Sequence, residues 1–174
     1  MALLQNAVNS KAEKPRVYLE TSVVSYLTAR ASRDLVVAAH QQITQEWWER
    51  ERTHYVLFVS DLVHVEAGQG NPDAAQRRLA LLEPLAVLEE SEEIRELAEL
   101  YAKEIPLPRR AAADALHMAL AAWHEMDYLL TWTCQHIANG FVRRRLEEID
   151  RTAAITSPTI CTPEELLYGN QNMD

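Results

Sequence analysis

Three acidic residues occupy places along the chain from which each could reach one end of a parallel sheet: Glu20, Glu66 and Asp114. Glu20 directly follows a short β-prone run, Glu66 lies one to two turns into an expected helix, and Asp114 lies in the first turn of another. Carboxylate oxygens suit Mg²⁺ and Mn²⁺ as ligands. Such ions promote phosphodiester hydrolysis by activating water and neutralising charge on the phosphoryl group. The three residues therefore predict a divalent-metal site that acts on phosphodiesters.

The elements that must position these carboxylates alternate between strand and helix. Short apolar, β-prone runs predict strands, and they lie at residues 16–19, 55–59, 86–88, 128–131 and 159–161. No Asn-Gly or similar hairpin turn joins two of them, so we expect a parallel sheet with helices on both faces. In such sheets ligands bind at the carboxyl ends of the strands, near a switch in strand order. The carboxylates are expected at this edge.

Helix-start signals divide the segments between the strands. Ser60, Ser91 and Asn139 stand as N-caps before helical segments, and Pro72 and Pro163 occupy first helical positions. The expected helices span about residues 34–52, 60–69, 91–104, 111–124 and 139–151, and others begin after residue 20, at residue 72 and at residue 163. The order of elements is therefore that of an α/β domain.

Length and composition indicate one domain. The chain has 174 residues, of which 48% are hydrophobic and 25% are charged, as in a compact globular protein. Residues 1–14 show no sustained period and are expected to be a flexible leader, with the domain at 15–168 and a tail at 169–174. No apolar run reaches the ~18 residues of a membrane span and no signal-peptide pattern occurs, which indicates a cytoplasmic protein.

The balance of charge is acidic, with a formal net charge of −9 and an isoelectric point near 5.2. This argues against broad, purely electrostatic binding of nucleic acid, because such binding needs Lys and Arg to replace counterions. It is compatible with carboxylates that are uncompensated until metal arrives, or with a face that pairs with a basic protein. Cys134 and Cys161 stand outside any Cys-x-x-Cys motif and are expected to be reduced thiols.

Four motifs that contain the candidate residues occur in order along the chain. They are Val17-Tyr18-Leu19-Glu20-Thr21-Ser22-Val23, Val59-Ser60-Asp61-Leu62-Val63-His64-Val65-Glu66, Ala113-Asp114-Ala115-Leu116-His117-Met118-Ala119-Leu120-Ala121 and Tyr128-Leu129-Leu130-Thr131-Trp132-Thr133. Together they resemble the PIN family, especially the VapC-type toxins of bacterial toxin–antitoxin pairs. The resemblance runs from residue 16 to residue 165. Four motifs in order are more specific than any one of them.

The resemblance implies a three-layer PIN-like α/β fold, with a central parallel sheet of about four to five strands flanked by helices. It also implies a ribonuclease that depends on Mg²⁺ or Mn²⁺, cleaves RNA, is commonly a homodimer, and is held inactive by a small antitoxin protein. By the resemblance, Glu20, Glu66 and Asp114 would be both the catalytic residues and the metal ligands.

The resemblance also assigns roles to hydroxyl groups. Thr21, Ser22, Thr131 and Thr133 would position water or the scissile phosphate, helped by backbone N–H groups at the helix start. No protein nucleophile is expected, since water activated by the ion would attack phosphorus.

Two positions depart from the family pattern. The family usually has Asp where this chain has Glu20, whose side chain is one methylene longer. It usually has an acid at the place of Thr133, whose hydroxyl can hold water but supplies no charge. With three carboxylates, one firmly held metal ion is more plausible than two. Asn139 could add a polar contact near the metal, although a helix cap is its simpler role.

Two other functions remain open. Thr133 in place of an acid also fits a PIN-like module that holds RNA or a protein partner without turnover. The same ions and sheet edge would serve a small-molecule phosphohydrolase. The chain has 4 glycines and no Gly-rich phosphate loop, which argues against that third function.

Several histidines and one cysteine allow a functional or a structural interpretation. His117 could contact substrate or transfer a proton, although packing is the more common role. Cys134 with His136, and His64 with Glu66, match no recognised zinc spacing.

The same choice applies to the arginine run and the tryptophans. Arg143-Arg144-Arg145 could steer RNA phosphates, and an exposed face paired with glutamates is at least as consistent with the sequence. Trp47, Trp48 and Trp132 could stack on bases, while core or dimer packing is the more common use.

Overall fold

The computed structural model describes residues 13–108 and 112–169, and it contains a sheet of five parallel strands. The strands are β1 (Arg16–Leu19), β2 (Val56–Ser60), β3 (Ala86–Leu88), β4 (Tyr128–Leu130) and β5 (Thr159–Cys161). Their number and parallel direction confirm the predicted fold class. Residues 1–12 of the expected leader and residues 170–174 of the expected tail lie outside the described residues.

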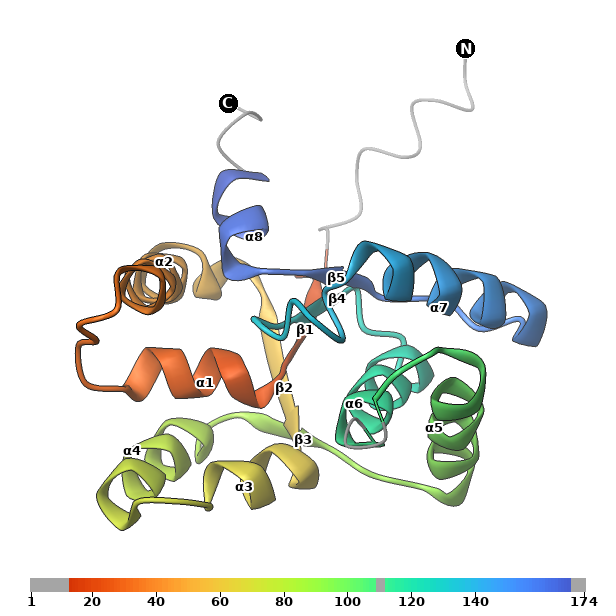
Figure 1. The fold of residues 1–174 in the computed structure, drawn as a ribbon, viewed down its shortest axis with the longest axis horizontal. Helices are drawn as coiled ribbons and strands as arrows, with labels where there is room; N and C mark the ends of the chain where they lie inside the picture. Colours follow the sequence, from red (N-terminus) through yellow and green to blue (C-terminus); the bar gives the residue numbers. More distant parts are fainter. Residues whose placement is uncertain (1–12, 109–111, 170–174) are drawn as a thin grey trace.

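Helices cover both faces of the sheet, so the molecule has three layers (Figure 1). In Figure 1, α1, α2 and α4 lie on one side of the sheet, and α5, α6 and α7 lie on the other. The helices are α1 (Thr21–Thr28), α2 (Leu35–Arg50), α3 (Asp61–Ala67), α4 (Pro72–Leu82), α5 (Glu92–Glu104), α6 (Ala112–Trp123), α7 (Gly140–Ala153) and α8 (Pro163–Gly169). Within the described ranges, none of them is long and apolar enough to cross a membrane.

β1 lies at the centre of the sheet, and the strands on its two sides come from distant parts of the chain. The order across the sheet is β3-β2-β1-β4-β5. β2 pairs with one edge of β1, and β4 pairs with the other, with Leu19 opposite Leu130. Glu20, just beyond β1, donates its backbone N–H to the Leu130 carbonyl at 3.0 Å. This is the switch in strand order at which open α/β sheets bind ligands.

Side-chain caps fix where the helices begin. Ser60, Ser91 and Asn139 each accept a hydrogen bond from a backbone N–H in the first turn of α3, α5 and α7. The Thr162 backbone N–H donates to the Glu165 carboxylate at 2.7 Å, and the Glu165 N–H donates back to the Thr162 hydroxyl at 3.3 Å. This reciprocal pair is a capping box at the start of α8, the helix expected to begin at residue 163. For α7, the hydrogen bond from the Phe141 N–H to Asn139 Oδ1 confirms that Asn139 is a helix cap.

Three helix boundaries differ from the sequence expectation. α2 ends at Arg50, where a 3-10 turn (Arg52–His54) follows. α3 ends at Ala67, where the Gln69 N–H closes a tighter turn onto the Glu66 carbonyl at 3.1 Å. α7 extends past residue 151 to Ala153 and ends at a residue in the left-handed conformation. Helix ends depend on such local closures, which periodicity does not specify.

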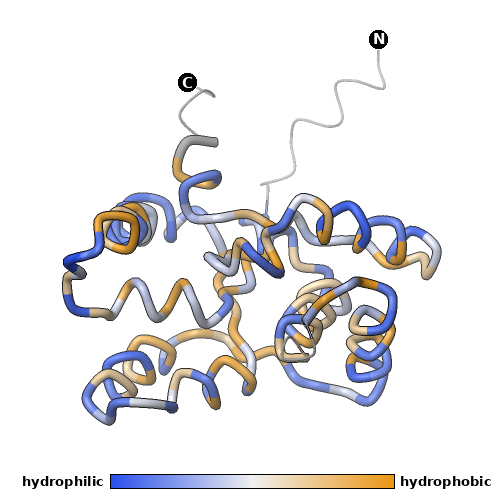
Figure 2. Tube along the Cα trace, in the orientation of Figure 1, coloured by the Kyte–Doolittle hydropathy of each residue, from blue (hydrophilic) through white to orange (hydrophobic). Residues whose placement is uncertain are grey.

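The core follows the strands and the inner faces of the helices, which Figure 2 colours as hydrophobic at the centre of the molecule. Trp47 is completely buried, and Trp132 is 8% exposed. The Trp132 indole N–H donates to the Thr44 hydroxyl at 2.8 Å. Both tryptophans therefore serve packing, which favours the structural interpretation of these side chains.

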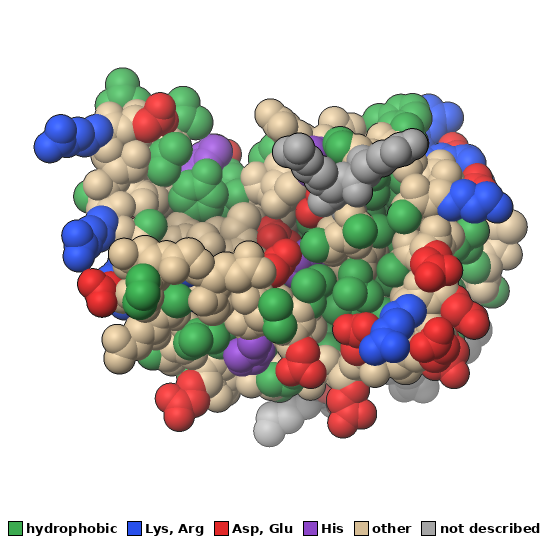
Figure 3. Space-filling model, turned by 60° about the horizontal axis from the view of Figure 1, so that its bottom comes forward, with side chains coloured by type: hydrophobic (Ala, Val, Ile, Leu, Met, Phe, Trp, Pro, Cys, Tyr) green, Lys and Arg blue, Asp and Glu red, His purple; other side chains and the backbone are tan. Residues whose placement is uncertain are grey.

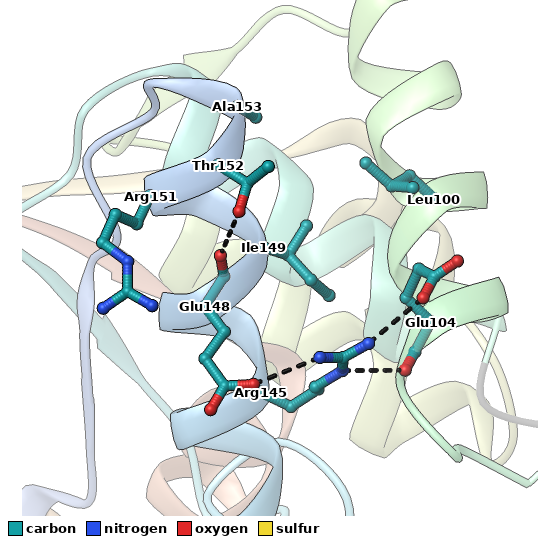
Figure 4. A pocket seen from close by; sticks show the side chains of 8 residues that line it. All are labelled: Leu100, Glu104, Arg145, Glu148, Ile149, Arg151, Thr152 and Ala153. Carbon is teal, nitrogen blue, oxygen red and sulfur yellow. Dashed lines mark hydrogen bonds and ion pairs between the residues drawn. The ribbon is translucent and has the colours of Figure 1, made fainter.

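A buried polar contact joins α5 to α7. Asp150 on α7 is completely buried and accepts hydrogen bonds from the Tyr101 hydroxyl of α5 and from Ser157. A groove of about 420 Å³ lies along the same two helices, and Arg145 spans it to the carboxylate and backbone carbonyl of Glu104 (Figure 4). α5 and α7 are thus held by polar contacts both inside and at the surface.

Candidate metal centre

Glu20 is the N-cap of α1 and lies at the end of the central strand. The Ser22 backbone N–H donates to Glu20 Oε1 at 3.1 Å, which satisfies a donor that the helix itself leaves without a partner. Glu20 is 5% exposed. A buried carboxylate needs several donors to offset its lost hydration, and hydroxyl groups supply them here.

Three hydroxyl groups donate to the second oxygen of Glu20, Oε2. Thr131 Oγ1 lies at 2.7 Å and Thr133 Oγ1 at 3.3 Å, and Ser22 Oγ donates as well. The Trp132 backbone N–H donates to Ser22 Oγ at 2.8 Å. The segment after β4 is thereby tied to the start of α1.

Glu66 approaches the same edge of the sheet from α3. Its Oε2 accepts a hydrogen bond from Thr21 Oγ1 and lies 3.1 Å from His117 Nε2. Burial raises the pKa of Glu66, but the His117 ring and the Thr21 hydroxyl favour the charged form, and the net pKa lies below its ordinary value. Glu66 is therefore a carboxylate at neutral pH. The four hydroxyl residues singled out from the sequence all contact Glu20 or Glu66.

A chain of buried hydrogen bonds leads away from Glu66. His117, on α6, is 1% exposed, and its Nδ1 lies 2.8 Å from the Tyr18 hydroxyl. The Tyr18 hydroxyl in turn lies 2.7 Å from Ser60 Oγ. We call the series Ser60, Tyr18, His117 and Glu66 the buried hydrogen-bond chain. It connects β1, the end of β2, α6 and α3.

The spacing of the ligand atoms fits a metal ion. One atom from each of Glu20, Glu66 and His117 lies within 4.8 Å of the others. Ligands at about 2.0–2.6 Å from a shared cation lie no more than about 5 Å apart. Across residues 13–108 and 112–169, no other group of three His, Cys, Asp or Glu residues meets this spacing. The two glutamates supply oxygen ligands of the kind that Mg²⁺ and Mn²⁺ take.

Asp114 lies outside this compact group. It stands in the first turn of α6, where its Oδ2 is 2.8 Å from His136 Nδ1 and its side chain is 17% exposed. Burial raises the pKa of Asp114, the His136 ring opposes that effect, and the charge of Glu20 raises the pKa further, so the net pKa is above its ordinary value. Asp114 therefore interacts electrostatically with Glu20 while its carboxylate is bound to His136.

A cleft of about 520 Å³ opens beside the glutamates. Its lining comes from α1, α2 and the end of α3, and consists of Glu20, Thr21, Ser22, Ser25, Tyr26, Ala29, Val37, Gln41, Glu66 and Gln69. Acidic side chains lie near the centre of the face shown in Figure 3, and most of its Lys and Arg side chains lie toward the edges. A substrate in the cleft would reach both glutamates.

Sequence reasoning named the hydroxyl residues, but it did not single out Tyr18 or pair His117 and His136 with the carboxylates. A signal existed for Tyr18, because residues two apart in an extended segment share a face, and Tyr18 is two before Glu20. His117 pairs with Glu66 across 51 residues, and His136 pairs with Asp114 across 22. Only the fold brings these partners together.

The histidines of the two pairs considered for zinc, Cys134 with His136 and His64 with Glu66, make other contacts in the structure. His64 Nδ1 lies 3.0 Å from the Ser60 carbonyl oxygen, and His136 is paired with Asp114. In the described part of the chain, neither His64 nor Cys134 belongs to a close group of potential ligands.

The arginine run pairs with acidic side chains on the surface. Arg143 contacts Glu165 at 3.2 Å, and Arg144 and Arg145 contact Glu148 at 3.4 and 3.1 Å. These contacts favour the interpretation as an exposed, charge-paired face.

Comparisons with known proteins bear on the fold. No protein-family model matches the chain, and no curated protein matches it. Among solved structures, it is similar to a chain in the crystal structure of VapBC2 from Rickettsia felis bound to a DNA fragment from their promoter. The TM-score is 0.52 at 13% identity, and the match covers 84% of this chain and 98% of the other. The chain therefore has the three-layer, PIN-like α/β fold that its sequence predicts.

Proposed function

We propose that this protein is a divalent-metal-dependent endoribonuclease of the PIN type. The observation that carries the proposal is the convergence of Glu20 and Glu66, each held by hydroxyl donors, at the switch in strand order of a PIN-like sheet. A fold alone hosts many functions. Here the residues at the binding edge also have the chemistry that phosphodiester hydrolysis needs.

Each residue has a role in this proposal. Glu20 and Glu66 would hold Mg²⁺ or Mn²⁺, and Asp114 would complete the site from the first turn of α6. When bound, the ion would lower the pKa of water and neutralise charge on the phosphoryl group. Thr21 orients Glu66 by its hydrogen bond, and Ser22 orients Glu20.

The segment after β4 has a role of its own. Thr131 and Thr133 donate to Oε2 of Glu20 and thereby hold its carboxylate in one position. The positive end of the α1 dipole would also favour an anionic phosphate near this end of the helix.

As the biological context we propose the toxin half of a toxin–antitoxin pair in the cytoplasm, acting as a homodimer. The sequence resemblance to VapC-type toxins supports this, and so does the fold shared with a chain of a VapBC2 complex. A net charge of −9 suits a basic segment on the antitoxin.

The test is RNA cleavage by the purified protein with Mg²⁺ or Mn²⁺, with and without EDTA. We expect cleavage in the presence of metal, and a loss of at least about 100-fold in Glu66→Gln and in Asp114→Asn. Glu96→Gln is the matched control, because it makes the same change on the exposed face of α5. Absence of cleavage with every metal, or cleavage that survives Asp114→Asn, would refute the proposal.

One observation favours a second function, that of a PIN-like binding module without turnover. Protein donors already bind both oxygens of Glu20, so the carboxylate has hydrogen-bond partners without a metal ion. Thr133 donates one of these bonds from the place where the family usually has an acid. RNA binding that is unchanged by EDTA and by Glu66→Gln, with no product formed, would support this second function over the first.

A further inference from the structure

The buried hydrogen-bond chain ends on one particular oxygen of Glu66. His117 Nε2 and Thr21 Oγ1 both approach Oε2. Oε1 accepts no hydrogen bond from the residues that the structure describes. The two donors come from α6 and from the first residue of α1, so they fix the carboxylate from two sides. One oxygen is therefore anchored, and the other remains available.

Hydrogen positions follow from the chemistry of the partners. The ionised Glu66 can only accept, so His117 Nε2 must carry a hydrogen and donate it. A tyrosine hydroxyl carries its hydrogen at neutral pH, so that of Tyr18 can donate one hydrogen bond and accept others. That hydroxyl contacts His117 Nδ1 on one side and Ser60 Oγ on the other. Whichever way it donates, the donor at Nε2 is unchanged.

His117 is better placed to orient Glu66 than to bind metal itself. Both of its ring nitrogens already have protein partners, at 2.8 Å and 3.1 Å, and the residue is 1% exposed. Glu66, by contrast, has a side chain that is 27% exposed and lines the cleft. The histidine therefore lies behind the carboxylate, in the position where metal sites commonly place the group that orients a ligand.

We infer that His117 is a positioning residue: held by Tyr18, it anchors Oε2 of Glu66 and presents Oε1 to a divalent cation in the cleft. This inference rests on the proposed metal-dependent function and names the residue that sets the affinity of that site.

Three substitutions at residue 117 separate positioning from packing. His117→Gln retains an amide N–H at the place of Nε2, and so keeps the contact with Glu66. His117→Asn retains a polar group at the place of Nδ1, and so keeps only the contact with Tyr18. His117→Leu removes both. We expect Mn²⁺, measured by its EPR signal, to bind about 10–100-fold more weakly to the Leu and Asn variants, and within about 3-fold of wild type to the Gln variant.

Tyr18→Phe provides an independent variant in the same chain of contacts. It removes the hydroxyl that holds His117 Nδ1 and leaves the ring in the core. We expect Mn²⁺ affinity to fall about 3–10-fold, less than in His117→Leu, because the contact with Glu66 remains. Circular dichroism and thermal melting establish that each variant is folded. An Asn variant that recovers affinity where the Gln variant does not would assign the effect to the contact with Tyr18, and a Leu variant that binds Mn²⁺ as tightly as wild type would show a packing role. Either result would overturn the inference.

Two spectroscopic measurements decide the same point without activity. In metal-free protein, ¹⁵N NMR of the histidines should show Nε2 of His117 protonated, with His117→Gln used to assign the signal. In the Mn²⁺ complex, pulsed EPR should show no directly coordinated nitrogen. An unprotonated Nε2, or a strong nitrogen coupling, would make His117 a ligand and overturn the inference. If wild type binds no Mn²⁺, the proposed function fails, while the NMR measurement still tests the contact with Glu66.

Discussion

At the scale of single residues, the two departures from the family pattern are in contact. The long side chain of Glu20 brings Oε2 to within 3.3 Å of Thr133 Oγ1. A second carboxylate at residue 133 would face that oxygen directly, whereas a hydroxyl donates to it. An acid at residue 133 would add a negative charge beside Glu20. Thr133 instead donates a hydrogen bond to the Glu20 carboxylate.

This contact predicts the effect of restoring an acid. Thr133→Asp should lower the unfolding free energy by about 1–3 kcal/mol in metal-free buffer, because two carboxylates then share a partly buried site. Saturating Mn²⁺ should recover more stability in this variant than in wild type. Thermal melts with and without Mn²⁺ measure both effects. Thr133→Asn is the control, because Asn is neutral and has nearly the same shape as Asp. Equal losses of stability in the Asp and Asn variants would contradict the explanation by charge.

The positions of Glu20, directly after β1, and of Glu66, in the helix after β2, could be argued from local sequence pattern. The roles of the four hydroxyl residues came only from the resemblance to the PIN family. The detailed contacts of these side chains could not be predicted. One oxygen of Glu20 accepts the hydrogen bond that caps α1. Asp114 pairs with His136 and lies outside the group formed by Glu20, Glu66 and His117. Such choices depend on side chains brought together from distant segments, and local pattern carries no information about them.

At the scale of elements, strands and helix starts were predictable because their signals are local. Ser91 and Asn139 cap the helices that their sequence context indicates. The packing of α5 on α7 was not predictable, because it depends on Asp150, whose position in a charged helix suggests exposure. The structure buries it against Tyr101 instead.

The buried carboxylate of Asp150 predicts a dependence of stability on pH. Burial raises the pKa of Asp150 above its ordinary value of 3.8, although Ser157 and Tyr101 oppose the effect. A raised folded-state pKa gives stability that is complete below about pH 3.8 and is lost as pH rises through the folded-state pKa. Asp150→Asn keeps an acceptor for Tyr101 and a polar partner for Ser157 but does not ionise. Relative to wild type, this variant should therefore gain stability as pH rises from about 3.8 through the folded-state pKa of Asp150.

Urea unfolding across this pH range measures the difference between the two proteins. Asp150→Ala is the comparison variant, because it leaves the buried Tyr101 hydroxyl without its acceptor and should cost about 1–3 kcal/mol. A constant difference between Asp150→Asn and wild type at every pH would show that Asp150 does not titrate in this range.

At the scale of the whole molecule, metal binding should be visible as stabilisation. A ligand that binds only the folded state at 100 times its dissociation constant adds about 2.7 kcal/mol. For a chain of 174 residues this corresponds to a rise in Tm of about 5–10 °C. Differential scanning calorimetry with Mn²⁺ should show this rise in wild type and little of it in Glu66→Gln. A rise of the same size in Glu66→Gln would place the ion elsewhere on this acidic protein.

The strand order also determines when, during synthesis, the candidate site can form. Glu20 is made early, but the hydroxyls that hold it come from residues 131 and 133, after the strand that completes the other side of β1. A nascent chain that ends before β4 contains Glu20, Glu66, Asp114 and His117 but lacks both hydroxyls and the strand beside Glu20. At least residues 1–133 must therefore be synthesised before the carboxylate of Glu20 can have all of its hydrogen-bond donors.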